Sequence, residues 1–586
     1  MRKTKIVATL GPSSSDIETI KELIKAGLDA ARINFSHGTY ESHGEVIDRL
    51  KEAREALDAP IPLILDTKGP EIRIKTFEKD SIFLEQGATF TLTTEDITGD
   101  ETKVSVTYAD LPKDVNVGGR VLIDDGLIEL TVKSLTDTDV VCEVVNSGYL
   151  GSRKGVNIPD VYVNLPSLTE KDIEDIKFGI KQGFDYVAAS FIRSASDVSA
   201  IRDVLERNGG DDIRIIAKIE SREGVDNIDA ILEVADGIMV ARGDLGVEIP
   251  PEEVPLVQKV LIEKANHKGK PVITATQMLE SMVSNPRPTR AEANDVANAI
   301  FDGSDAIMLS GETAKGKYPV ESVRMMARIA QTAESSVQYR DDLAEHHHET
   351  FQANITNAVG YAACTTAADL NAACIAAVTD QGFTARMISR FRPECPILAI
   401  TPVERVWRQL NLVWGCVPAL AGIIQGSDEV FNAAVKKSME TNLASEGDAV
   451  VIAAGVPVGI AGTTNTMRVV IVGDVIARGQ GYSGQVIGGV ANVIKVTELA
   501  DKYFRAGDIL VTTRTTNEMI PYIRKAAAVV VGSWEKIDNT HAETVARALE
   551  KPLIVCEQKV VDLISDGLPI TVDTVNGFVY NGIRGS

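Results

Sequence analysis

A lysine and a glutamate stand two positions apart at the end of an apolar run, in the sequence RIIAKIE of residues 214–220. Successive side chains of a β-strand alternate between its faces, so we expect Lys218 and Glu220 to project from the same side. A cation and a metal-binding carboxylate directed at one point suit chemistry on a phosphorylated, carboxylate-bearing substrate. A buried ion pair would give the same local pattern, so the rest of the chain must decide between the two interpretations.

Eight short apolar runs alternate with helical segments between residue 1 and about residue 340. The strand-like runs cover residues 5–10, 30–35, 61–66, 186–191, 214–220, 237–242, 271–277 and 306–310. Helix-like stretches such as 16–26, 43–57, 170–182 and 320–332 fall between them. Eight parallel strands with helical crossovers predict an α/β fold, a (β/α)8 TIM barrel, whose chemistry lies at the C-terminal strand ends. Polar residues gather where these runs end: Arg32, Asn34, Ser36, Asp66, Thr67, Lys218, Glu220, Arg242, Asp244, Thr276, Ser310 and Glu312.

The segment after the third run is too long to be a helical crossover. Short strand-like runs at 88–92, 103–108, 120–124, 127–130 and 140–145 alternate there with turns, and Asp125-Gly126 predicts a hairpin. We expect residues 70–165 to form an inserted β-barrel lid domain beside the catalytic end of the barrel, which itself takes residues 1–69 and 166–340.

Two further units follow the barrel. Residues 341–349 are polar and hold three consecutive histidines, which we interpret as a solvated linker rather than a metal site. Apolar runs at 373–379, 396–401, 448–455 and 469–473, with helices such as 355–370, predict an open α/β domain over 341–473. Residues 474–586 form a Gly-rich extra C-terminal unit with expected strands at 508–513, 528–532 and 552–556.

The composition excludes several classes of protein. A length of 586 residues with 44% hydrophobic and 24% charged residues fits a multidomain globular protein. The net charge of -23 argues against nucleic-acid and anionic-membrane partners. Six cysteines without a CxxC pair indicate a reducing compartment. The first apolar run is too short for a signal peptide and no stretch reaches membrane-spanning length, so we expect a cytoplasmic protein.

Six motifs, taken together and in order, resemble the pyruvate kinase family from Lys3 to about Gly473. They are residues 31–38 (ARINFSHG), 65–73 (LDTKGPEIR), 154–157 (KGVN), the 214–220 run, 239–246 (MVARGDLG) and 274–280 (TATQMLE). The resemblance implies transfer of the phosphoryl group of phosphoenolpyruvate to ADP, giving pyruvate and ATP. Such transfer depends on positioning and charge neutralisation more than on covalent chemistry.

The resemblance assigns roles at the substrate. Arg32 offers a guanidinium fork to the transferring phosphate, and Lys218 stabilises charge on the phosphoryl group and the enolate oxygen. Glu220 and Asp244 are expected to bind Mg²⁺ (or Mn²⁺), and Gly243 allows a backbone N–H to approach a substrate carboxylate. Thr276 belongs to the substrate-binding and proton-relay group in the family. Taken from local sequence alone, Thr276 would be an ordinary β-branched strand residue.

The resemblance also implies a monovalent cation and a nucleotide. Asn34, Ser36, Asp66 and Thr67 are the family's K⁺ positions, and Glu71 accompanies K⁺-dependent members. Arg73 and Lys154 are expected to hold the ADP phosphates, with Asn34 and His37 near the nucleotide. Without the resemblance, each basic residue could equally be a solvated surface charge.

Two assignments concern regulation and assembly. The loop 379–384 resembles the site for a phosphorylated effector, with Thr379, Gly382 and Thr384 retained but Gln381 replacing a serine common in relatives. Thr289 and Glu292 read as a capping box that opens a helix over 291–301. In the family this helix lies at a subunit interface, which agrees with a homotetramer.

The C-terminal unit resembles the swivelling phosphohistidine domain of phosphoenolpyruvate-utilising enzymes, through residues 507–511, 526–530 and 539–542. His541 falls at the phosphorylated position. The small residues that normally precede it are replaced by residues 536–538 (KID), so we expect a structural or modulatory module rather than phosphotransfer. Three alternatives to a pyruvate kinase remain: an Mg²⁺-dependent aldolase or lyase, a non-catalytic effector-sensing relative, and transfer through His541.

Overall fold

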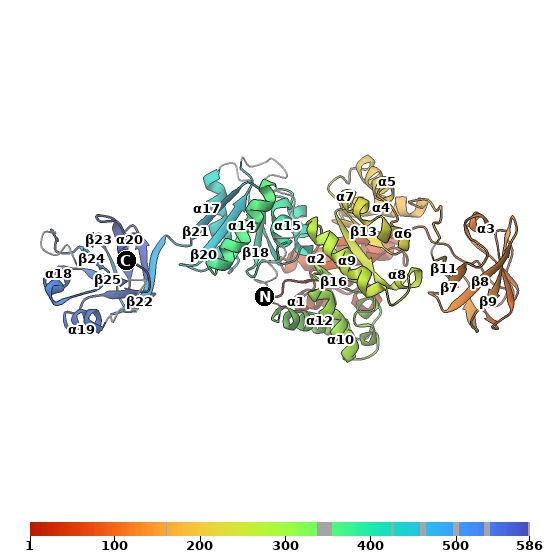
Figure 1. The fold of residues 1–586 in the computed structure, drawn as a ribbon, viewed down its shortest axis with the longest axis horizontal. Helices are drawn as coiled ribbons and strands as arrows, with labels where there is room; N and C mark the ends of the chain where they lie inside the picture. The colour runs from red at the N-terminus through yellow and green to blue at the C-terminus, as the bar shows by residue number, and fades with distance from the viewer. Residues whose placement is uncertain are drawn as a thin grey trace. The chain divides into compact units, whose positions relative to one another are not determined.

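The computed structural model describes residues 1–159, 161–336, 354–422, 427–456, 464–495, 503–532 and 540–583. The chain divides into two compact units (Figure 1). The first comprises Met1–Cys364, Ala377–Gly426 and Ala454–Asn465, and the second comprises Thr365–Ala376, Ser427–Ala453 and Thr466–Ser586. The polar segment 341–349 lies outside the described residues, and the limits expected for the four domains stay predictions.

All eight expected barrel strands are present. They are β1 (Lys5–Thr9), β2 (Ala30–Asn34), β3 (Leu63–Asp66), β12 (Tyr186–Ala189), β13 (Arg214–Ile219), β14 (Gly237–Ala241), β15 (Val272–Ala275) and β16 (Ala306–Leu309). They close a parallel barrel in the order β1-β16-β15-β14-β13-β12-β3-β2. Val7, Ile64, Ile216, Met239 and Ile273 belong to the core that fills its interior. The TIM barrel is confirmed, and each strand ends at or before the expected residue, so Glu220 and Asp244 lie just beyond β13 and β14.

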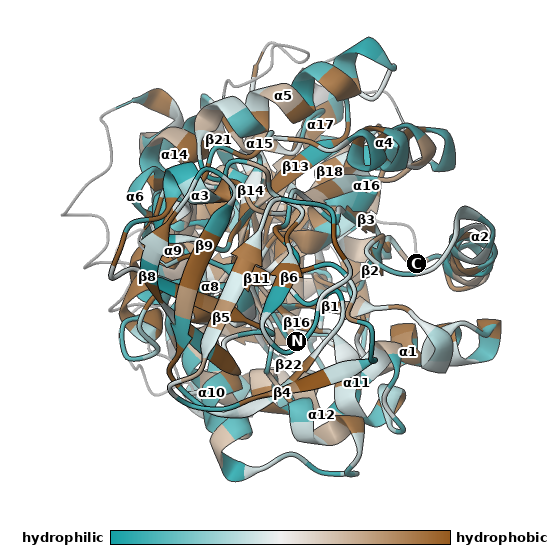
Figure 2. Ribbon diagram, turned by 90° about the vertical axis from the view of Figure 1, so that its right-hand side faces the viewer, coloured by the Kyte–Doolittle hydropathy of each residue, from teal (hydrophilic) through white to brown (hydrophobic). Residues whose placement is uncertain are grey.

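The helices cover the outside of the barrel. The main ones are α1 (Ile17–Ala26), α2 (Tyr40–Ala56), α4 (Glu170–Gln182), α5 (Ala195–Arg207), α7 (Ile228–Val234), α9 (Val254–His267), α10 (Arg290–Phe301) and α12 (Pro319–Glu334). Figure 2 shows hydrophilic residues, in teal, along the outer helices α2 and α4. The expected capping box of α10 is present, because Glu292 N donates to Thr289 Oγ1 at 3.2 Å and Thr289 N donates to Glu292 Oε2 at 2.7 Å. Three short helices at strand ends were not expected: α6 (Arg222–Asp226), α8 (Arg242–Glu248) and α11 (Gly311–Ala314).

The inserted segment forms the expected β lid. Its strands are β4 (Ser81–Leu84), β5 (Thr89–Thr93), β6 (Lys103–Ser105), β7 (Arg120–Ile123), β8 (Ile128–Leu135), β9 (Asp139–Val144), β10 (Gly148–Gly151) and β11 (Val156–Asn157), with one short helix, α3 (Leu111–Asp114). A six-stranded and a two-stranded sheet enclose one apolar core. The predicted hairpin is confirmed, since β7 and β8 pair antiparallel around Asp125-Gly126, where both residues have positive φ.

The elements after the barrel form the expected α/β domain. They are α14 (Ile355–Asp369), β17 (Cys374–Val378), α15 (Phe383–Ser389), β18 (Ile397–Thr401), α16 (Glu404–Gln409), β19 (Cys416–Leu420), α17 (Ser427–Glu440), β20 (Ala449–Ala454) and β21 (Thr466–Ile471). β18 and β19 pair in parallel, and β19 was not expected because Pro418 interrupts its short apolar run.

The extra C-terminal part closes a second, mixed barrel. Its strands β22 (Val475–Tyr482), β26 (Leu553–Cys556), β25 (Ala528–Gly532), β24 (Ile509–Thr512), β23 (Val486–Val493), β27 (Pro569–Asp573) and β28 (Phe578–Asn581) are neighbours in that order. An ideal Cβ on Gly479 or Gly481 would lie 2.2 Å from Val555 O or 2.1 Å from Thr574 O, so only glycine allows this close strand approach. The helices α18 (Ile520–Lys525), α19 (Thr540–Ala548) and α20 (Val560–Leu563) accompany it. Throughout the described parts of the chain, no helix is both long and apolar enough to cross a membrane.

Candidate active site

The side chain of Lys218 lies at the centre of a buried polar cluster at the C-terminal end of the barrel. Its Nζ lies 2.9 Å from Glu220 Oε1, 3.2 Å from Asp66 Oδ1 and 2.7 Å from Ser190 Oγ. The expected same-side projection of Lys218 and Glu220 is therefore present. Burial alone would lower the pKa of Lys218, but the charges of Asp66 and Glu220 outweigh it and raise the pKa above its usual value. The ammonium group stays protonated and is available to stabilise negative charge.

Arg32 approaches the same carboxylate from β2. Its Nε donates to Asp66 Oδ2 at 2.6 Å and its Nη1 donates to Thr9 Oγ1 at 2.8 Å. Burial opposes ionisation of Asp66, but the cations Arg32 and Lys218 together hold its pKa below the usual value. Asp66 thus holds both cations in place. Among the described residues none bonds Arg32 Nη2, which leaves that end of the guanidinium for an anion.

Glu220 and Asp244 bring two carboxylates together. Burial raises the pKa of Glu220 to about 7, Lys218 opposes this rise, and Asp244 adds to it. Burial also raises the pKa of Asp244, whose side chain hydrogen-bonds Glu220. The backbone N–H of Phe191 donates to Glu220 Oε2 at 2.5 Å and fixes its orientation.

This pair fits a divalent cation. The pKa of each carboxyl group is raised above its usual value, so the pair carries more negative charge than its surroundings neutralise. Its hard oxygen atoms are the ligands that Mg²⁺ or Mn²⁺ prefers. No cluster of three or more His, Cys, Asp or Glu side chains suited to a metal occurs in the described part of the chain. The remaining ligands would therefore have to come from substrate and water.

Gly243 and Thr276 face each other across the ends of β14 and β15. The N–H of Gly243 donates to Thr276 Oγ1 at 2.7 Å, and that hydroxyl donates to Ala275 O at 2.6 Å. Arg242 anchors this corner, because its guanidinium contacts both carboxylate oxygens of Asp295 in α10, at 2.7 and 2.8 Å, and donates to Thr276 O at 2.7 Å. Thr276 has a φ of 69°, which places it in the left-handed region rather than in a regular strand.

The four residues expected to bind K⁺ lie where β2 and β3 end side by side. Asn34 is the register partner of Asp66, Ser36 follows β2, and Thr67 follows β3. Asn34 Oδ1 accepts the N–H of Ser36 at 3.0 Å. The side chains of these four residues offer oxygen atoms as metal ligands. The one carboxylate among them, Asp66, is already paired with Arg32 and Lys218. An oxygen site of low net charge fits a monovalent cation better than a second divalent one.

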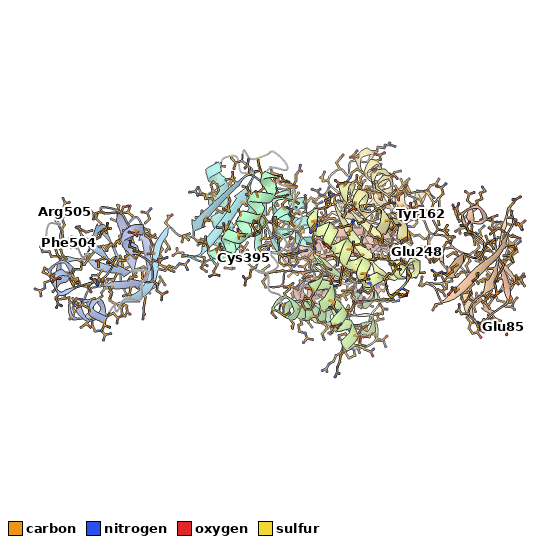
Figure 3. All side chains as sticks on the ribbon, in the orientation of Figure 1. Glu85, Tyr162, Glu248, Cys395, Phe504 and Arg505 are labelled. Carbon is orange, nitrogen blue, oxygen red and sulfur yellow. The ribbon has the colours of Figure 1, made fainter. Side chains whose placement is uncertain are left out.

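The residues expected to bind nucleotide are less closely gathered. Arg73 forms an ion pair with Glu71 at 2.7 Å, and Lys154 forms one with Asp124 at 2.9 Å. Both basic side chains are therefore paired with carboxylates of the lid segment. His37 is exposed in the turn before α2. The lid contacts the barrel nearby, where Asn157 Nδ2 donates to Glu248 Oε1 at 2.8 Å. A cavity of about 290 Å³ lies between the lid segment and the barrel, and its lining includes Glu220, Glu248 and Tyr162. Figure 3 labels Glu248 and Tyr162.

Comparisons with known proteins point to one family. Family models described as pyruvate kinase barrel domain, pyruvate kinase alpha/beta domain and PEP-utilising enzyme mobile domain match residues 1–323, 357–470 and 504–577. The pyruvate kinases of Geobacillus stearothermophilus and Staphylococcus aureus are 49% and 47% identical over 99% of both chains. The chain belongs to the pyruvate kinase family. A crystal structure of a pyruvate kinase from Cryptosporidium parvum is 41% identical, with a TM-score of 0.77 over 80% of this chain and 96% of that one.

Sequence reasoning missed three residues that shape this pyruvate kinase site. Ser190 bonds Lys218 and also donates to Thr67 O at 2.7 Å. Phe191, with a φ of 55°, directs its N–H at Glu220. Asp295 anchors Arg242 from a helix 53 positions away. Of the three, only Ser190 could have been found from the sequence, because it is a polar residue near the end of the 186–191 run.

The two assignments outside the barrel stay predictions. In the expected effector loop, Gly382 has a φ of 76° and Thr384 Oγ1 lies 2.9 Å from Thr464 Oγ1, while Thr379 is buried at the end of β17. At the start of α19, His541 Nδ1 lies 2.8 Å from Thr515 Oγ1 and Nε2 lies 3.0 Å from Asn517 Oδ1. Residues 536–538, which argued against phosphotransfer, lie outside the described residues.

Proposed function

We propose that this pyruvate kinase family member transfers the phosphoryl group of phosphoenolpyruvate to ADP, forming pyruvate and ATP, with Mg²⁺ (or Mn²⁺) and K⁺. The observation that supports the proposal most strongly is the position of Lys218 Nζ, held by Asp66, Glu220 and Ser190 beside the Glu220–Asp244 pair. A buried ion pair alone would also satisfy the three N–H donors of Lys218, but it would not need a further carboxylate, Asp244, hydrogen-bonded to Glu220.

The chain's own groups suit the steps of this transfer. Arg32 binds and orients the departing phosphoryl oxygens through the guanidinium end that Asp66 and Thr9 leave free. Lys218 stabilises the charge that develops on the phosphoryl group and on the enolate oxygen. A divalent cation held by Glu220 and Asp244 would supply further neutralisation of substrate oxygens. Arg73 and Lys154 would hold the ADP phosphates by exchanging their lid carboxylates for them.

Thr276 has an orienting role and does not itself donate the proton to the enolate carbon. Its hydroxyl proton is directed to Ala275 O and its lone pair accepts from Gly243, so it cannot also protonate the enolate carbon. The residue therefore positions a water for that step. Binding of a phosphorylated effector at Thr379, Gly382 and Thr384, and assembly into a homotetramer through α10, belong to the same proposal.

One assay tests this proposal against its alternatives. Purified full-length chain is given phosphoenolpyruvate and ADP, with and without Mg²⁺ and with and without K⁺, while ATP and pyruvate are measured. We expect equal amounts of ATP and pyruvate only when Mg²⁺ is present, and faster formation with K⁺. Absence of ATP under all conditions would refute the proposal. Release of pyruvate without ADP would favour a lyase instead.

A further inference from the structure

A second cavity lies at the opposite end of the barrel from Lys218. It has a volume of about 140 Å³ and lies between the N-terminal ends of β13–β15 and the helices α15 and α16, all within the first compact unit. Arg214, which lines it, opens the same strand that ends near Lys218, four residues and therefore about 13 Å further along. The cavity is thus separate from the active site.

The lining of this cavity is strongly cationic. Four basic side chains and one acidic side chain line it: Arg214, Lys268, Lys270, Arg386 and Asp236. The charge of Asp236 is already paired, because its carboxylate accepts hydrogen bonds from Arg214 at 2.8 Å and from Arg202 at 2.5 Å. It also accepts the backbone N–H of Ile215 at 2.9 Å. Lys268 pairs with Glu233. Of the four basic side chains, Arg214 and Lys268 are therefore in ion pairs and two others are not.

These two cations, Arg386 and Lys270, form no ion pair among the described residues, although Asp236 lies close enough to act on both electrostatically. Arg386 Nη1 donates to Gln381 O at 3.1 Å, and Lys270 Nζ donates to the carbonyl oxygens of Leu232, Glu233 and Ala235. Burial lowers the pKa of Arg386 to about 10 and lowers the pKa of Lys270 as well. The nearby carboxylates of Asp236 and Glu233 already pair with other cations. An anion in the cavity would therefore add negative charge that its lining lacks.

We propose that this cavity binds a phosphomonoester dianion. A guanidinium fork and an ammonium group are the side chains that best match phosphate oxygens. Since a water molecule occupies about 30 Å³ of liquid, the cavity holds a phosphate group with a small organic part. The site differs from the predicted effector loop, whose Thr384 hydroxyl bonds Thr464 instead.

The cavity is linked to that loop through one carbonyl group. Gln381 O accepts from Arg386 Nη1 at 3.1 Å and from Arg214 Nη2 at 3.2 Å. An anion that draws both guanidinium groups toward itself competes directly with Gln381 O. Occupancy of the cavity therefore changes how the loop after β17 is held.

Calorimetric titration of the full-length chain tests the proposal. The probes are inorganic phosphate and glycerol 2-phosphate, with chloride at matched ionic strength as the blank. The test protein is Arg386→Gln/Lys270→Gln, and the matched control is Arg405→Gln/Lys264→Gln, which removes two exposed ion pairs, with Asp212 and Asp229. We expect the control to bind both probes like wild type and the cavity variant to lose one binding event, with affinity there reduced at least tenfold.

Unchanged stoichiometry and affinity in the cavity variant would overturn the proposal. Binding of phosphate without binding of glycerol 2-phosphate at this site would overturn the assignment to a phosphomonoester. If the double variant does not fold, Lys270→Gln alone is titrated, and the same weakening is required. Turnover without added phosphate is expected to stay normal in these variants, which separates loss of the cavity from damage to the active site.

Discussion

Ser190 Oγ lies 2.7 Å from Lys218 Nζ and 2.7 Å from Thr67 O, so one hydroxyl joins the proposed catalytic lysine to a residue of the expected K⁺ site. The serine is buried, and its own N–H donates to Thr67 Oγ1 at 3.1 Å. Because the hydroxyl proton goes to Thr67 O, a lone pair faces the ammonium group. We therefore expect Ser190 to position Lys218 and to couple the two proposed sites.

Replacement Ser190→Ala should lower kcat/KM and raise the K⁺ concentration needed for half-maximal activation. A buried group left without its partner costs about 1–3 kcal/mol, which corresponds to roughly five- to 150-fold in kcat/KM. Steady-state kinetics over a K⁺ titration measures both effects. Ser304→Ala is the matched control, since Ser304 is equally buried and bonds Thr274 Oγ1 at 2.7 Å. A Ser190→Ala enzyme with the K⁺ response of wild type would contradict the coupling.

Gly243→Ala should raise the KM for phosphoenolpyruvate without affecting folding. An ideal Cβ at this position lies 3.5 Å from Thr276 Oγ1, an ordinary contact, so the protein itself does not require glycine there. A requirement for glycine would have to come from a bound substrate. We expect an increase in KM of about tenfold or more, because the added methyl group would keep the substrate carboxylate away from the Gly243 N–H, which donates to Thr276 Oγ1 in the structure. Gly246→Ala on the same helix, with its nearest neighbour 3.7 Å away, should leave KM unchanged. Equal KM values in both variants would remove Gly243 from the substrate site.

Glu71→Lys should make the enzyme less dependent on K⁺. By the family resemblance, the substitution would place a fixed cation near the expected monovalent site, and it would also free Arg73, which now pairs with Glu71 at 2.7 Å. We expect higher activity without K⁺, a smaller activation when K⁺ is added, and a changed KM for ADP. Initial rates with and without K⁺ at constant ionic strength measure this. An activation ratio equal to that of wild type would argue against the K⁺ assignment.

Arg408→Gln should destabilise the first compact unit. Arg408 Nε lies 3.0 Å from Asp185 Oδ1, and both side chains are buried. Breaking a buried pair costs about 3–5 kcal/mol, whereas an exposed pair contributes at most about 1 kcal/mol. Arg405→Gln, on the same helix, removes only the pair with the exposed Asp212 and is the control. Urea unfolding followed by circular dichroism should show a clearly lower midpoint for Arg408→Gln alone. Equal midpoints would mean that the buried pair is not stabilising.

The barrel could be predicted from sequence because its strands are apolar runs closed by polar residues. Lys218, Glu220, Asp66 and Arg32 stand at such ends, so their convergence followed from the strand order. The role of Ser190 could not be predicted, because its contact with Lys218 joins residues 28 positions apart through side-chain geometry. The helix α8 was missed because seven residues are too few to show a helical period.

The C-terminal barrel shows the same limit. Its apolar strands β24, β25 and β26 were predicted, whereas the Gly-containing strands β22 and β23 were not, because glycine is uncommon in strands unless another backbone approaches closely. That approach is a property of the closed barrel and not of the local sequence.

Turnover by Lys218→Met is the most direct test of the proposed mechanism. The substitution keeps the length of the side chain and removes the charge that Asp66, Glu220 and Ser190 hold in place. We predict that ATP formation from phosphoenolpyruvate and ADP falls by roughly a thousandfold or more, while ADP binding measured by calorimetry remains. Near-normal turnover in this variant would contradict the assignment of Lys218 as the group that stabilises the transferring phosphate.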